Sequence, residues 1–471
     1  MTTSPQRATA YHFQLIKGEN FSKILPRTIP IIDAVEIYWV CREANLTRLI
    51  LLPLTVHGQA PDNHLLSSAF TIIDKGVVSM HWRSKLIHPT AQAPSGFRSL
   101  VTPIYRGSTV LFDKQEDAAD DWRQTERGYT YGLYGSPTVL ELGARVAEIE
   151  GARHSFVVPG GQAAIALVYL AFCKAGSHAL VPVTGYGPNR ELADGLLKGL
   201  NIEVEAYDPL IGADIAKLIR PNTALIWTES PGSVTMELQD VPAIVKAAHA
   251  RGVLVALDNT YAAGVLFDAF AHGVDVSMQA LTKYIGGHSD LLLGTVSVAS
   301  EVTYEAIGSV FKQLGMGVSP DDAGLALRGL QTLGVRLERL EKSTLEVASW
   351  LDLQHEIASV LHPAFPSCPG HEFWKRDFSG SASVFSILFK SDISANQVGA
   401  FVDRLRLFKI GFSWGGVTAL AVRYPELDRP GKDYGGRLVR LNIGLEEPAD
   451  LIADLKQALE SVAKCETPAL P

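Results

Sequence analysis

The sequence has few cysteines, no excess of positive charge and no long apolar run. Its four cysteines lie far apart along 471 residues and form no C-x-x-C pair, which excludes a disulfide scaffold and a zinc ribbon: Cys41, Cys173, Cys368 and Cys465. The 42 Lys and Arg residues against 50 Asp and Glu residues give a net charge of −8, so we expect no nucleic-acid partner. The longest early apolar runs, Ile37–Cys41 and Leu49–Val56, are much shorter than the ~20 residues of a membrane span. With no apolar core of a secretion signal at the start, these features predict a cytoplasmic protein without membrane contact.

The first 79 residues differ from the rest, since they show no sustained helical or strand period. An orderly pattern starts only after Met80. We therefore expect 1–79 to be an N-terminal extension that is poorly ordered, or that precedes the true start of the protein at Met80.

From residue 139 onward, strands and helices alternate. Val139, Leu142, Val146 and Ile149 mark one face of a helix that ends before Gly151. Strands are predicted at 156–158, 179–183, 202–206, 223–230, 253–260 and 274–283, with helices at 162–172 and 241–250 among the segments between them. This order predicts a mainly parallel sheet with helices on both faces.

After about residue 330 the pattern changes to a long helix, shorter strands at 383–389 and 438–443, and a terminal helix through Leu451 and Leu459. We expect a large α/β domain followed by a smaller α+β domain. The expected divisions are the extension 1–79, an N-terminal arm and inter-subunit loop 80–140, the large domain 141–330 and the C-terminal domain 331–471.

Phosphate-loop, zinc-protease and strand-flanked G-x-G-x-x-G motifs are absent, so nucleotides and metal ions are not the expected ligands. The strongest positive signal is Lys283, which follows an apolar strand and precedes Gly286-Gly287. A partly desolvated lysine has a lowered amine pKa and is suited to form a Schiff base. The alternative is a surface lysine at a strand end.

Asp258 ends another apolar strand, at the edge where open parallel sheets bind ligands. A carboxylate there can keep a pyridine nitrogen protonated, as pyridoxal 5'-phosphate (PLP) requires. The alternative, a helix N-cap, is equally compatible with the sequence.

Other candidates lie between strands and helices or in the C-terminal part. Gly160-Gly161-Gln162 opens a helix whose free N–H groups could bind an anion, or forms a plain turn. Tyr186 could stack on a cofactor ring or be an ordinary loop residue. Arg440, in an apolar run, should meet a carboxylate or form a structural salt bridge.

Taken together these residues identify a resemblance that extends from about Met80 to Ala463. The chain resembles the PLP-dependent Cys/Met-metabolism (trans-sulfuration) enzymes, most closely the bacterial cystathionine β-lyases. The matching segments are DPLIGADI (208–215), ESPGSVTMELQDVPAIV (229–245), DNTYAAGVLF (258–267), TKYIGGHSD (282–290), RGLQTLGVRL (328–337), GHEFWKRDFSG (370–380), FSWGG (412–416) and VRLNIGLE (439–446).

The resemblance implies the fold-type-I PLP-dependent transferase fold (aspartate-aminotransferase-like) and a homotetramer, a dimer of dimers with shared active sites. It implies catalytic roles for Lys283, Asp258 and Tyr186, which also bind the cofactor. Further cofactor contacts are implied for Gly160, Gly161, Gln162 and Thr282, and for Tyr131, lent by the neighbouring subunit. Substrate contacts are implied for Arg440, Ser413, Trp414 and Tyr134.

Two departures from the family pattern affect the cofactor's phosphate end and the substrate's distal end. Leu133 follows Tyr131-Gly132 where the family usually has a phosphate-binding arginine, and the next residue, Tyr134, is not basic. Ala280 stands three residues before Lys283, where many relatives have serine.

The resemblance also implies the reaction. It is α,β-elimination of cystathionine to homocysteine, pyruvate and ammonia, a step of methionine biosynthesis. The alternatives are a γ-lyase, a γ-synthase or a cysteine desulfhydrase, and, from another class, a catalytically silent PLP-fold protein. The retention of Lys283, Asp258 and Arg440 disfavours the silent protein.

Overall fold

The computed structural model describes residues 37–43, 46–52, 81–87, 99–427 and 429–464. The chain separates into two compact units, Met1–Val78 and Ser79–Pro471. Within the described ranges, no helix combines the length and the apolarity needed to cross a bilayer.

In the first unit, β1 (Ile37–Glu43) pairs with β2 (Leu46–Leu52) as antiparallel strands, from Ile37 opposite Leu52 to Glu43 opposite Leu46. Both strands are rich in the β-branched, aromatic and leucine residues that favour extended backbone. Their apolar residues are nearly continuous, which explains why no period-two alternation marked them in the sequence. The other residues of 1–79, and with them most of the expectation of a poorly ordered extension, lie outside the described ranges.

The second unit contains a seven-stranded sheet of order β3-β9-β8-β7-β6-β4-β5. From β8 to β5 neighbouring strands are parallel, whereas β9 is antiparallel to both β8 and β3, so the predicted mainly parallel sheet is confirmed. The strands are β3 (His154–Val158), β4 (His178–Pro182), β5 (Glu203–Tyr207), β6 (Thr223–Glu229), β7 (Leu254–Asp258), β8 (Val276–Ala280) and β9 (Gly294–Val298). Only β9 was not expected. It returns antiparallel because residues 281–293 form turns and extended chain rather than a crossover helix.

Helices cover both faces of this sheet, because successive side chains of its strands point to opposite sides. On one face, Leu180, Ile226 and Leu257 pack in a core with α7 (Val241–His249). On the other, Val181 and Trp227 pack in a core with α5 (Gly161–Phe172) and α8 (Glu301–Leu314). The expected helix on the Val139 face is α4 (Pro137–Glu150), and Gly151 ends it in the left-handed conformation.

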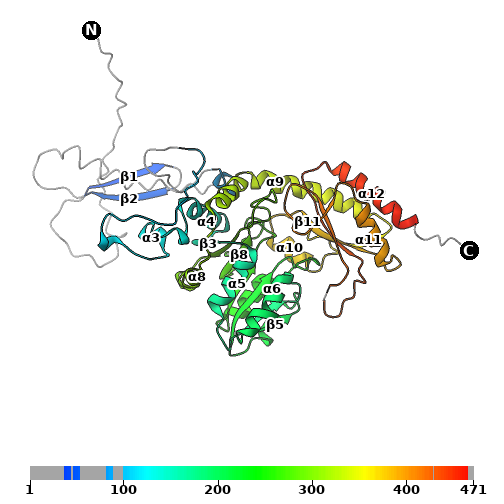
Figure 1. The fold of residues 1–471 in the computed structure, drawn as a ribbon, viewed down its shortest axis with the longest axis horizontal. Coiled ribbons are helices and arrows are strands. Elements are labelled where there is room, and N and C mark those ends of the chain that lie inside the picture. The colour runs from blue at the N-terminus through cyan, green and yellow to red at the C-terminus, as the bar shows by residue number, and fades with distance from the viewer. Residues whose placement is uncertain (1–36, 44–45, 53–80, 88–98, 428, 465–471) are drawn as a thin grey trace, which may run out of the picture. The chain divides into compact units, whose positions relative to one another are not determined.

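A five-stranded sheet of order β10-β11-β14-β13-β12 forms the C-terminal part. Helix α12 (Pro448–Lys464) packs against α9 (Pro320–Asp352) and α11 (Ala395–Arg404) beside this sheet (Figure 1). Its strands are β10 (Ile357–Leu361), β11 (Val384–Phe389), β12 (Lys409–Ile410), β13 (Leu420–Tyr424) and β14 (Leu438–Asn442). The expected boundaries after residues 140 and 330 fall inside α4 and α9, so a continuous helix crosses each of them.

The short helix α2 (Trp82–Lys85) is joined to the body of the second unit. Leu86 is buried in the same core as Leu142 and Leu333, and its carbonyl accepts a hydrogen bond from Arg145 Nη2 at 3.0 Å. The contacts of the second unit therefore begin close to Met80.

We expect a chain that begins at Met80 to fold and to keep its activity. A matched chain that begins at Leu100 lacks Leu86 and should lose about 1.5–3 kcal/mol of unfolding free energy, because one large apolar side chain is no longer buried. Thermal unfolding and activity of both chains test this. Insoluble or inactive protein from the Met80 start would show that the first unit is needed.

Candidate active site

Two buried carboxylates and a lysine meet at the carboxyl edge of the parallel strands. Asp258 is the last residue of β7 and Glu229 is the last of β6, while Lys283 comes three residues after the end of β8. All three line a cavity of about 340 Å³. Nine of the twelve site residues expected from the sequence line this cavity: Gly160, Gly161, Gln162, Tyr186, Asp258, Thr282, Lys283, Trp414 and Arg440.

The Lys283 amine is held by the C-terminal part of the chain. Its Nζ donates to Ser413 Oγ at 2.7 Å and lies 5.2 Å from the Trp414 ring centroid. Burial lowers the pKa of Lys283 to about 8, and the positive charge of Arg440 adds to this effect while Asp258 opposes it. Near neutral pH a substantial share of Lys283 is therefore the free amine that acts as nucleophile or base.

Asp258 is directed into the cavity and does not cap a helix. Its Oδ1 accepts the N–H of Thr260 at 3.0 Å, and turns rather than a helix follow β7. Burial raises the pKa of Asp258, whereas the hydrogen bonds from Thr260 and the charge of Lys283 oppose that rise. A cationic group bound in the cavity would restore the ionised form.

The helix start at Gly160-Gly161 lines one end of the cavity, where free backbone N–H groups could bind an anion. A Cβ on Gly161 would lie 2.8 Å from the Cβ of Ala280, so the backbone approaches here only because residue 161 is glycine. The first N–H groups of α5 have no partner within the helix. Thr282 adds a hydroxyl, whose Oγ1 accepts the N–H of Leu293 at 3.2 Å.

Arg440, on β14, faces the cavity from the other side. Its Nη2 donates to the Ser413 carbonyl at 3.2 Å, and its guanidinium carbon lies 5.6 Å from the Tyr424 ring centroid. Within the described part of the chain no carboxylate pairs with Arg440, so the structural salt bridge considered from the sequence is not formed there. The guanidinium is placed to bind a carboxylate that enters the cavity.

Ser413, which contacts both Lys283 and Arg440, has a strained backbone conformation. Its φ of +80° is in the left-handed region, which serine rarely adopts. In this conformation its hydroxyl contacts Lys283 and its carbonyl contacts Arg440, so one residue links the two cations.

Sequence reasoning assigned no role to Glu229. Its Oε2 accepts the main-chain N–H of Tyr186 at 2.7 Å, and Tyr186 leads into the short helix α6 (Gly187–Leu192). Burial raises the pKa of Glu229 well above its usual value, and the charge of Asp258 raises it further. The signal that could have found Glu229 was present, since it ends an apolar strand in the same way as Asp258.

Tyr131 and Tyr134 do not line the cavity of their own chain. Tyr134 is buried, and its hydroxyl donates to Asp120 Oδ1 at 2.6 Å, whereas Tyr131 is exposed. Leu133 lies close to Gly317, where an added Cβ would come within 3.0 Å of it, so this segment packs on the body of its own chain.

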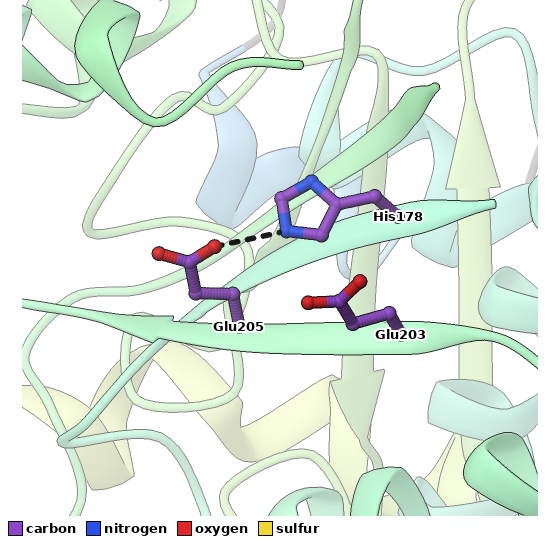
Figure 2. Close-up of side chains that lie close together, drawn as sticks. All are labelled: His178, Glu203 and Glu205. Carbon is purple, nitrogen blue, oxygen red and sulfur yellow. Dashed lines mark ion pairs between the residues drawn. The ribbon is translucent and has the colours of Figure 1, made fainter. Parts of the chain in front are cut away.

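A second cluster lies at the opposite edge of the sheet. His178 begins β4, and Glu203 and Glu205 lie on the neighbouring strand β5 (Figure 2). His178 Nε2 is 3.3 Å from Glu205 Oε2, but Arg220 donates to both carboxylates, to Glu203 Oε1 at 2.8 Å. Arg220 already supplies the positive charge that a metal ion would bring, so we interpret the cluster as an ionic network that joins strand ends.

We expect Lys283 to react with acetic anhydride at lower pH than ordinary lysines do. Labelling of the ligand-free protein, followed by peptide mass spectrometry, should reach half its maximum near pH 8 at Lys283, because only the free amine reacts. The exposed Lys217 is the internal control and should need a higher pH for the same labelling, because its side chain is not removed from water. Parallel titration of the two lysines would contradict the desolvated site.

Comparisons with known proteins agree with this geometry. The sequence model of one protein family, the Cys/Met metabolism PLP-dependent enzymes, matches residues 83–460. The chain is 42% identical to a cystathionine β-lyase of Escherichia coli (strain K12) over 75% of this chain and 91% of that protein. It is 40% identical to a cystathionine β-lyase of Haemophilus influenzae over 80% of this chain and 97% of that protein.

A solved structure is also similar. It is a cystathionine γ-synthase of Xanthomonas oryzae pv. oryzae in complex with aminoacrylate and cysteine, with a TM-score of 0.75 and 27% identity over 82% of this chain and 99% of that one. These likenesses confirm the expected fold-type-I architecture. The chain belongs to the Cys/Met-metabolism family of PLP-dependent enzymes.

Proposed function

We propose that this enzyme cleaves L-cystathionine by α,β-elimination, so that cystathionine and one water give L-homocysteine, pyruvate and ammonia, as a step of methionine biosynthesis. The observation that carries the proposal is the Lys283 amine, which is desolvated between Asp258 and Arg440 in one cavity. The names of the Escherichia coli and Haemophilus influenzae relatives support the substrate.

The residues of the cavity fit PLP. Lys283 would hold the cofactor covalently, and Asp258 would face its ring nitrogen, where a buried carboxylate needs a cationic partner. The amides of Gly160 and Gly161, with Gln162 and the Thr282 hydroxyl, would hold the phosphate, and the Tyr186 ring would lie against the cofactor. When bound, PLP withdraws electrons from the substrate's Cα and so stabilises the carbanion left by proton removal.

The chain's own groups perform binding and proton transfer. Arg440 binds the α-carboxylate of the substrate through a charge-assisted contact, with Ser413 and Trp414 beside it. Lys283, as the free amine, would take the proton from Cα. The Cβ–S bond then breaks with its electron pair on sulfur, and the Lys283 ammonium can return the proton to the departing thiolate.

The assembly we propose is a homotetramer of two dimers, in which Tyr131 of one subunit reaches the cavity of its neighbour. In support, Tyr131 is exposed and does not line its own cavity. Leu100 and Leu111, in the segment before it, are 95% and 90% exposed, and a neighbouring subunit that covered them would remove their apolar surface from water. We propose that the extension 1–79 takes no part in catalysis.

We also propose a cytoplasmic location. Cys173 and Cys368 are free and buried thiols. Such thiols are compatible with a reducing compartment.

The experiment that tests the reaction is product analysis with purified, PLP-loaded enzyme and cystathionine. We expect homocysteine and pyruvate in equal amounts, and loss of at least a thousandfold in kcat for Lys283→Ala, because the removed amine is the base. Lys217→Ala is the matched control. Cysteine with 2-oxobutyrate would instead identify γ-cleavage, and full turnover by Lys283→Ala would remove the mechanism.

If two subunits share each active site, we expect subunits with different substitutions to restore activity when they assemble together. A Lys283→Ala subunit and a Tyr131→Ala subunit are each impaired, but together they form one site with Lys283 from one subunit and Tyr131 from the other. After unfolding and refolding together, the mixture should exceed the summed activity of the two variants, up to about a quarter of the unmodified enzyme if subunits pair at random. Activity equal to that sum would show that Tyr131 does not serve a neighbouring site.

A further inference from the structure

Glu229 and Asp258 are neighbouring carboxyl groups at the carboxyl edge of the sheet. They end adjacent parallel strands and lie directly opposite each other in the register of β6 and β7. Both side chains are buried, and both line the cavity. Asp258 has a place in the proposed function, but Glu229 has none, and a buried acid beside another acid is costly to keep without a role.

The position of Glu229 is fixed by its own neighbours. Its main-chain N–H donates to Gln239 Oε1 at 2.9 Å, and the Gln239 amide donates in turn to the Tyr207 hydroxyl at 3.0 Å. Gln239 is anchored as well, since its N–H donates to Ser230 Oγ at 3.0 Å. These hydrogen bonds fix the end of β6, so the Glu229 carboxyl can hold a neighbouring loop at a defined distance from the sheet.

The loop that Glu229 reaches is the one that carries Tyr186. In the described structure, the hydrogen bond from the Tyr186 N–H at 2.7 Å is the single hydrogen bond made by the Glu229 carboxyl. The Tyr186 carbonyl accepts the N–H of Asn189 at 2.9 Å, which fixes the turn after Tyr186 but not its distance from the sheet. Tyr186 as a whole is 42% exposed, so packing alone does not hold it in place.

We propose that Glu229 is a positioning residue of the active site, whose carboxyl holds the main chain of Tyr186 and thereby fixes the Tyr186 ring at the cavity wall. The inference rests on PLP binding in this cavity and not on which thioether the enzyme cleaves. Glu229 acts through Tyr186, so its effect is limited by what the Tyr186 ring contributes.

The surroundings of Glu229 indicate which substitute should preserve this role. Burial and the charge of Asp258 both favour the uncharged form of Glu229, and a neutral carboxyl can still accept an N–H at Oε2. Glutamine has nearly the same shape and offers a carbonyl oxygen at that place. Alanine and leucine offer no acceptor and leave the N–H of Tyr186 without its carboxyl partner.

The test is a titration of the apoenzyme with PLP, in which binding is monitored by the absorbance of the PLP ring or by tyrosine fluorescence. It is carried out for Glu229→Ala, Glu229→Gln, Tyr186→Ala and the double variant Glu229→Ala/Tyr186→Ala. Glu229→Ala should weaken PLP binding by roughly five- to fiftyfold, because the part-buried hydrogen bond that holds the Tyr186 main chain is lost. Glu229→Gln should restore binding to within about threefold. Glu203→Ala, at the opposite edge of the sheet, is the matched control and should bind PLP normally.

The double variant separates positioning from a general effect on the fold. If Glu229 acts through Tyr186, the double variant should bind PLP no more weakly than Tyr186→Ala alone, within about twofold. Multiplied losses would overturn the proposal and place the effect of Glu229 on Asp258. Glu229→Gln as weak as Glu229→Ala would also overturn it, since the hydrogen bond would then not be what matters.

Two measurements keep these outcomes interpretable. Thermal unfolding of each apoenzyme shows whether Glu229→Ala is folded, and Glu229→Leu, which fills the volume without an acceptor, replaces it if it is not. Because PLP affinity is measured without substrate, a wrong assignment of cystathionine leaves the result unaffected. If the single and double variants do not behave as predicted while the enzyme still cleaves cystathionine normally, only the role of Glu229 is contradicted.

Discussion

The rest of the site depends on keeping one primary amine out of water between charges of opposite sign. Lys283 leaves β8 at the carboxyl edge of the sheet, where Asp258 approaches from the neighbouring strand and Arg440 from the C-terminal part of the chain. Removal from water and the nearby guanidinium both disfavour its ammonium form, which lowers the pKa of Lys283 to about 8. Ser413, strained in the left-handed region, joins Lys283 to Arg440 and so holds this charge arrangement together.

Much of this arrangement could be predicted because its signals are local in the sequence. Asp258 and Lys283 each follow an apolar strand, and Gly160-Gly161 stands between a strand and a helix, so their common edge follows from the parallel sheet alone. Arg440 could be recognised as an unusual residue, but its distance from Lys283 depends on how the two sheets are placed within the second unit. Glu229 ends an apolar strand in the same way as Asp258, but its contact with the main-chain N–H of residue 186 leaves no mark in the sequence, so its role could not be predicted.

The packing around Ala280, Leu133 and Tyr134 accounts for the residues at which this chain departs from the family pattern. Ala280 packs its methyl group against Gly161, so the start of α5 is close to β8 and Thr282 is the hydroxyl at that end of the cavity. Leu133 and Tyr134 turn toward the body of their own chain, where an apolar and an uncharged side chain can be buried and an arginine could not without a partner. Leu133 and Tyr134 do not line the cavity and Ala280 lies against Gly161, so these changes leave the surroundings of the Lys283 amine intact.

The central claim is that Lys283 is the residue that carries the cofactor at this edge of the sheet. Reduction of the PLP-loaded enzyme with sodium borohydride, followed by digestion and mass spectrometry, fixes the cofactor to the lysine that holds it. The account predicts one pyridoxyl group per chain, on the peptide containing Lys283. A pyridoxyl group on any other lysine, with Lys283 unmodified, would contradict it.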